Sequence, residues 1–81
     1  MAQVHLPQQL ERLTGGDRVL ELAVPDYRSL IAALEERYPG IRGAIEKDFA
    51  VVIDGDIIND PLLEPIPPEA EIHFLHRIGG G

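Results

Sequence analysis

Hydrophobic and polar residues alternate along several stretches of the chain, a pattern typical of strands with one buried face. Together with one continuous apolar run, these stretches predict strands at residues 3–6, 18–24, 49–53, 57–58 and 71–75. In the last strand Ile72 and Phe74 share one face, and His73 and Leu75 share the other. The dipeptide Asp54-Gly55 predicts a hairpin between the third and fourth strands, because such pairs favour tight turns.

Between the second and third strands, the apolar spacing changes to that of a helix. Apolar side chains recur at helical intervals at Leu30, Ile31, Leu34 and Tyr38. Asp26 is a typical N-cap, so we predict a helix over residues 27–38 that Pro39 ends. Residues 7–14 predict a short helical turn, and residues 41–47 predict only an irregular turn.

The predicted order is strand, strand, helix, strand, short strand, strand, with neither an internal repeat nor a linker. One main helix packed on one face of a small mixed sheet buries both apolar surfaces most simply. This order is that of the ubiquitin-like β-grasp, an α+β fold. We predict a β-grasp domain over residues 1–76 and a flexible glycine tail over residues 77–81. The core is expected to contain Val4, Leu6, Leu20, Leu22, Leu30, Leu34, Val52, Ile72 and Phe74.

Length and composition restrict the possible functions. The chain has 81 residues, of which 44% are hydrophobic, as expected for one small soluble domain. Its formal net charge of −7 predicts repulsion from nucleic acid and anionic membranes and attraction to basic protein surfaces. No apolar run approaches the roughly 20 residues of a membrane span. Cysteine is absent, which excludes disulfides, thiol nucleophiles and thiolate metal sites. We therefore expect a cytoplasmic protein with no nucleic-acid or membrane partner.

The chain ends in Ile78-Gly79-Gly80-Gly81, directly after the last predicted strand. A frayed end is one interpretation, because glycine loses the most backbone entropy on ordering. The other is steric, since a chain without Cβ atoms can enter a channel that excludes every side chain. Extended, the five residues from Arg77 to Gly81 span about 17 Å. That length would place a carboxylate deep inside a partner's active site.

The length, the element order and one C-terminal segment resemble the MoaD/ThiS sulfur carriers, which include the small subunit of molybdopterin synthase. That segment is Phe74-Leu75-His76-Arg77-Ile78-Gly79-Gly80-Gly81, and its diglycine is the specific part. The resemblance implies that the Gly81 carboxylate is adenylated and then converted to a thiocarboxylate. It also implies that Gly80, which has no side chain, lets the Gly81 carboxylate pass through the channel of a partner's active site. It also implies a protein carrier, not an enzyme, that binds no cofactor itself, with ATP and magnesium belonging to the activating enzyme. His76-Arg77 stands where molybdopterin-synthase small subunits usually carry a proline-rich step.

The resemblance implies three partners: an E1-like adenylating enzyme, a sulfur donor and a sulfur-acceptor enzyme such as a molybdopterin synthase large subunit. Docking is expected at Leu75, Arg77, Ile78 and Gly79, because an outward leucine beside a reactive tail is a plausible anchor. Two alternatives stay open: a ubiquitin-like modifier conjugated through Gly81, and a non-catalytic interaction module. The resemblance favours molybdopterin synthesis, whereas the sequence leaves open the final sulfur acceptor, the sulfur donor and the oligomeric state.

Two other groups of side chains suggest cation binding. His5 and His73 would be neighbours if the first and last strands pair, but two histidines lack the third firm ligand of a metal site. Asp54, Asp56 and Asp60 resemble a cation loop, yet no bidentate glutamate follows at the required spacing. We interpret these aspartates as turn formers and predict no metal site.

Overall fold

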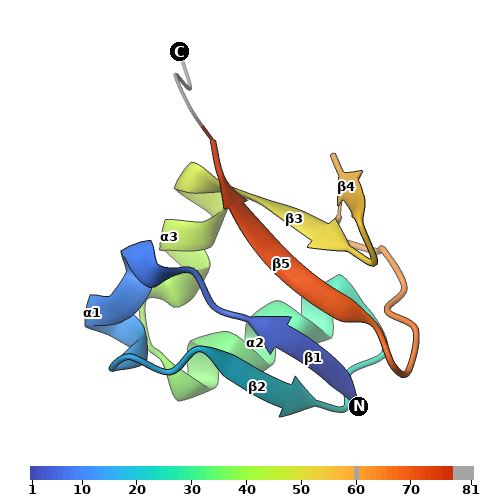
Figure 1. Ribbon diagram of the computed structural model, residues 1–81, viewed down its shortest axis with the longest axis horizontal. Coiled ribbons are helices and arrows are strands. Elements are labelled where there is room, and N and C mark those ends of the chain that lie inside the picture. Colours follow the sequence, from blue (N-terminus) through green and yellow to red (C-terminus); the bar gives the residue numbers. More distant parts are fainter. Residues whose placement is uncertain (60, 78–81) are drawn as a thin grey trace.

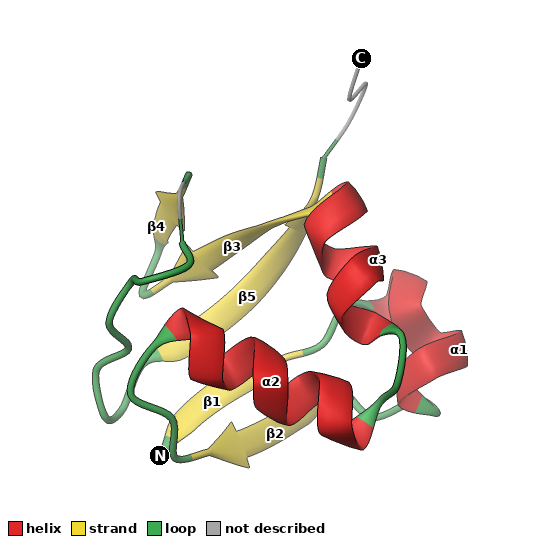
Figure 2. Ribbon diagram, turned by 180° about the vertical axis from the view of Figure 1, so that it is seen from behind, coloured by secondary structure: helices red, strands yellow, loops and turns green. Residues whose placement is uncertain are grey.

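A five-stranded mixed sheet with helices on one face makes up the part of the chain that the computed structural model describes, residues 1–59 and 61–77. The elements in chain order are β1 (Ala2–His5), the 3-10 helix η1 (Gln8–Leu10), α1 (Glu11–Thr14), β2 (Val19–Leu22), α2 (Tyr27–Arg37), α3 (Ile41–Asp48), β3 (Phe49–Ile53), β4 (Asp56–Ile58) and β5 (Glu71–His76). The strand order is β2-β1-β5-β3-β4, with β5 parallel to β1 and antiparallel to β3. Figure 1 shows α2 and α3 behind the sheet, and Figure 2, from the opposite side, shows them in front of it. In the described part of the chain, the other face of the sheet carries no helix. This architecture is the predicted ubiquitin-like β-grasp.

The main helix, α2, begins where the sequence predicts. The Asp26 carboxylate accepts a hydrogen bond from the Ser29 backbone N–H at 2.8 Å, which caps the helix and lowers the pKa of Asp26. Leu30 and Leu34 are fully buried against the sheet. The helix ends at Arg37, before the proline that cannot continue it.

The helix α3 occupies the segment for which the sequence predicts only an irregular turn, so that prediction is wrong. Gly40 adopts φ 99°, which allows the chain to reverse direction directly after α2. Ile41 and Ile45, four residues apart, are both fully buried. The Glu35 carboxylate accepts hydrogen bonds from the backbone N–H groups of Gly40 and Arg42, each at 2.9 Å. These bonds satisfy donors at the start of α3 that have no partner within the helix. Tertiary packing and a cap from α2 therefore stabilise this short helix.

Most of the predicted core is confirmed. The buried cluster between sheet and helices includes Val4, Leu6, Leu30, Leu34, Ile72 and Phe74. Leu20 and Leu22 lie on the edge strand β2 and pack against the cluster while partly exposed. Val52 is buried but lies outside the cluster, because it pairs with His73 and Ile57 on the helix-free face of the sheet. The β3 residues on either side of Val52 fill the core instead.

The predicted turn between β3 and β4 is present. Asp54 and Gly55 both have positive φ, 49° and 85°, as a tight hairpin turn of this hand requires. The Asp54 carboxylate also accepts the backbone N–H of Glu71 at 2.9 Å, which ties the turn to the start of β5. Asp60 lies outside the described residues. None of the helices in the described part of the chain has the length and apolarity to cross a membrane.

Candidate functional site

The central strand β5 leads directly to the predicted reactive tail. It lies between β1 and β3, and its last residue, His76, pairs with Phe49. The ring of His76 packs edge-on against the Phe49 ring, with centroids 5.1 Å apart. Four predicted site residues, Ile78, Gly79, Gly80 and Gly81, lie outside the described residues. The site that the structure describes is therefore the root of the tail and the sheet surface beside it.

Arg77 fixes the root of the tail to α3. Its backbone N–H donates to the Asp48 carbonyl oxygen at 2.7 Å, and its Nη2 donates to the Glu46 carbonyl oxygen at 2.8 Å. The last carbonyls of a helix have no partner within the helix, and a positive charge near them is favourable. Arg77, predicted from sequence only as a docking residue, thus also anchors the end of β5.

A pocket of about 290 Å³ opens beside this root and includes Tyr27, Glu46, Phe49 and Arg77 in its lining. Burial raises the pKa of Tyr27 to about 12; the Glu46 charge raises it too, and the Arg77 charge lowers it. The phenol therefore stays neutral at physiological pH. Among the described residues, the lining of this pocket contains no serine, cysteine or histidine. Nothing in this lining forms a nucleophile–base pair.

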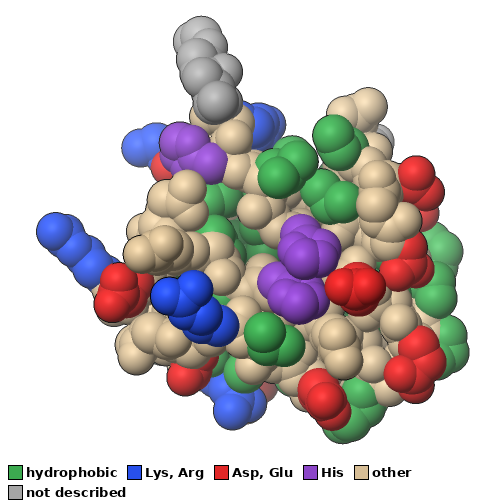
Figure 3. Space-filling model, viewed as in Figure 1, with side chains coloured by type: hydrophobic (Ala, Val, Ile, Leu, Met, Phe, Trp, Pro, Cys, Tyr) green, Lys and Arg blue, Asp and Glu red, His purple; other side chains and the backbone are tan. Residues whose placement is uncertain are grey.

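The helix-free face of the sheet carries an apolar patch next to the root of the tail. We define the Leu75 patch as Leu75 on β5, Ala50 and Val52 on β3, and Ile57 on β4, which the strand pairing places side by side. Leu75 is 49% exposed, as the strand phase predicts, and Ile57 is exposed as well. Figure 3 shows hydrophobic side chains gathered on this face beside the histidines. Exposed apolar side chains that lie together, as Leu75 and Ile57 do here, are typical of a protein docking surface.

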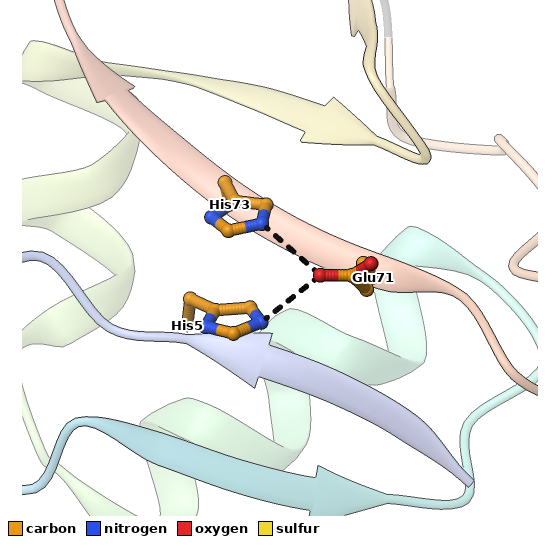
Figure 4. A group of neighbouring side chains, drawn as sticks. All are labelled: His5, Glu71 and His73. Atoms are coloured by element: carbon orange, nitrogen blue, oxygen red, sulfur yellow. Dashed lines mark ion pairs between the residues drawn. The ribbon is translucent and has the colours of Figure 1, made fainter.

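The structure brings His5 and His73 together and supplies a third donor that sequence reasoning missed. The two imidazole rings stack with centroids 4.1 Å apart and an interplanar angle of 5°. Glu71 lies beside both, with its Oε1 3.6 Å from His5 Nε2 and 3.7 Å from His73 Nε2 (Figure 4). The sequence did contain one indication that Glu71 lies beside His73. The two residues are two apart in a predicted strand, and such residues share a strand face.

Comparison with known proteins finds one matching family model and solved structures of similar fold. The family model described as the ThiS family matches residues 4–81. Two solved structures share the fold: the BexX/CysO complex of Amycolatopsis orientalis contains a chain with a TM-score of 0.86, 19% identity and full coverage of both chains. CysO of Mycobacterium tuberculosis, described as an antigen, has a TM-score of 0.84 and 17% identity over 96% of this chain and all of that one. No curated protein matches the sequence.

Proposed function

The chain belongs to the ThiS family, and on this premise we propose that it carries sulfur as a thiocarboxylate on Gly81. One observation carries the proposal: the family match covers residues 4–81, which include the glycine run, and this supports a role for the glycines. Proteins of this family are small carriers and not catalysts. The chain is accordingly a protein co-substrate, and catalysis is left to its partners.

The proposed chemistry takes place at the C-terminal carboxylate in two steps. A carboxylate oxygen of Gly81 attacks the α-phosphorus of ATP, and pyrophosphate leaves together with the magnesium that the E1-like enzyme supplies. Sulfide then attacks the acyl carbon of this adenylate, and AMP leaves with the oxygen, so that one sulfur replaces one oxygen. The activating enzyme must enclose the adenylate to exclude water, and glycine at positions 80 and 81 leaves room for that enclosure.

Docking is proposed to use the Leu75 patch and the root of the tail. Leu75 is exposed on the sheet face opposite to the buried cluster, and the hydrogen bond from Arg77 to Glu46 holds the end of β5 against α3. Ile78 and Gly79 are proposed as further docking residues. A net charge of −7 favours a partner with a basic surface, so association should weaken with salt. The CysO chain crystallised with BexX supports a partner protein for this fold.

For the sulfur acceptor we propose molybdopterin synthesis, with a molybdopterin synthase large subunit as the acceptor enzyme. The thiocarboxylated chain would be mixed with that subunit and its pterin precursor, and dithiolene formation would be measured. Formation of the dithiolene product supports this acceptor. No product, while the same chain transfers sulfur to another acceptor enzyme, would overturn this part of the proposal and leave the carrier role intact.

The carrier role is tested by ATP–pyrophosphate exchange with the E1-like enzyme. The full chain should support exchange, whereas the chain lacking Gly80-Gly81 should not. Val19→Ala is the matched control, because Val19 is exposed on the far edge strand of the same sheet. Exchange at an undiminished rate without the diglycine would leave only an interaction module. Conjugates to target lysines instead of a thiocarboxylate would favour the ubiquitin-like modifier.

A further inference from the structure

The helix-free face of the sheet carries a histidine pair and a carboxylate for which the proposed sulfur chemistry has no use. We propose that His5, Glu71 and His73 form a binding site for one divalent transition-metal ion of the zinc type. Figure 4 shows the two imidazole rings and the carboxylate on neighbouring strands, with both ion-pair lines meeting at Glu71. Their ligand atoms all lie within 4.8 Å of one another. The proposal does not rest on sulfur transfer.

Strand pairing places these three side chains together. β1 and β5 are parallel, with Gln3 opposite Glu71 and Val4 opposite Ile72, so His5 comes next to His73. Glu71 and His73 are two residues apart on β5 and therefore point to the same face. The Asp54 carboxylate binds the Glu71 backbone N–H at 2.9 Å and holds this end of the strand. The backbone positions of the donors are thus fixed by the sheet.

The two histidine–carboxylate distances are close to those of a zinc site. A tetrahedral zinc ion with bonds of about 2.0–2.1 Å to nitrogen and oxygen separates its ligand atoms by roughly 3.3–3.4 Å. Glu71 Oε1 is 3.6 Å from His5 Nε2 and 3.7 Å from His73 Nε2, so each gap needs to close by only a few tenths of an ångström. The stacked rings must also tilt so that both lone pairs meet at the ion.

His5 provides a second, independent observation in favour of the metal site. Its Nε2 is buried and makes no hydrogen bond with any described residue, although buried polar atoms are normally paired. That atom faces the Glu71 carboxylate, whose side chain is 62% exposed and free to swing toward an ion. Three protein ligands beside solvent would leave the fourth position of the ion to water, as in open zinc sites.

The donor set selects the class of cation. Two imidazole nitrogens and one carboxylate oxygen suit zinc, nickel or copper, whereas magnesium and calcium prefer oxygen ligands alone. The carboxylate also balances part of the charge of the ion, and the net charge of −7 on the chain favours cation binding further. We therefore expect Zn²⁺ to bind and Mg²⁺ not to bind.

The test is calorimetric titration of the full chain, without an affinity tag, with ZnCl₂ near neutral pH. One Zn²⁺ per chain is expected to bind. His73→Gln and Glu71→Gln should each weaken binding by at least the roughly 10- to 100-fold that loss of an outer-shell partner costs. The matched control is His76→Gln, because the third histidine lies on the same strand outside the cluster and should leave binding unchanged. Circular dichroism melting would confirm that each variant folds.

NMR titration provides a readout that does not depend on the variants. Zn²⁺ should shift the ring resonances of His5 and His73 and leave those of His76 in place. Absence of one-to-one binding, equal binding of MgCl₂, or affinity unchanged by His73→Gln would overturn the site. So would a loss of affinity in His76→Gln as large as in His73→Gln.

Discussion

Replacing Leu75 tests whether the Leu75 patch is the docking surface for the activating enzyme. Leu75 is 49% exposed in the free chain, so about half of its side chain remains to be buried by a partner. Full burial of a leucine side chain contributes roughly 1.5–3 kcal/mol, and half of that is about 0.7–1.5 kcal/mol. Leu75→Ala should therefore raise the Kd by roughly 3- to 12-fold, since 1.4 kcal/mol corresponds to tenfold.

Leu75→Asp should weaken binding more than Leu75→Ala, because docking would then desolvate a carboxylate without a partner. The matched control is Val19→Asp. Val19 is 50% exposed on the same face of the sheet but lies on the far edge strand, β2. Calorimetric titration with the E1-like enzyme would give both affinities, and thermal melting would show that both variants fold. Equal affinity of Leu75→Asp and the wild type, or an equal loss in Val19→Asp, would refute this docking surface.

Three further predictions concern the core, a helix cap and the tail. Leu34→Ala removes a fully buried side chain, and Phe74→Ala a buried one, so each should lower the free energy of unfolding by roughly 2–5 kcal/mol in urea denaturation; a smaller loss would contradict the packing. Because the hydrogen bond from the Ser29 N–H lowers the pKa of Asp26 in the folded state, the cap stabilises the protein above the usual aspartate pKa, and this contribution disappears as the pH falls through the lowered value. The melting temperatures of wild type and Asp26→Ala should thus converge in acid, and a constant difference would refute the cap. Gly81→Ala should abolish or sharply reduce adenylation without changing the melting temperature, and normal adenylation would contradict the enclosed channel.

Local patterns were sufficient to predict most of the fold. Alternation of apolar residues predicts the strands and their buried faces, as with Ile72 and Phe74 in β5. The Asp26 cap and the Asp54-Gly55 turn involve residues close in sequence, so both were predictable too. The helix α3 was not, because its stability comes from the burial of Ile41 and from a capping carboxylate on α2.

The candidate site was predictable from sequence only where it depends on the alternation of side chains along a single strand. The outward orientation of Leu75 follows directly from strand alternation. The contact of Glu71 with His5 depends instead on the parallel register between β1 and β5, two strands at opposite ends of the sequence. The bond from Arg77 to the Glu46 carbonyl likewise requires a helix that the sequence pattern did not predict. Long-range register and tertiary capping therefore account for what sequence reasoning missed.

Mass spectrometry of the C-terminal peptide tests the central claim most directly. The chain would be incubated with the E1-like enzyme, ATP, magnesium and isotopically labelled sulfide, then digested and fragmented. The account predicts that the fragment containing Gly81 gains the mass of one labelled sulfur in place of one oxygen, and that omission of ATP prevents this gain. Labelled sulfur elsewhere in the chain, or an unmodified C-terminal fragment after ATP has been consumed, would contradict the sulfur-carrier account.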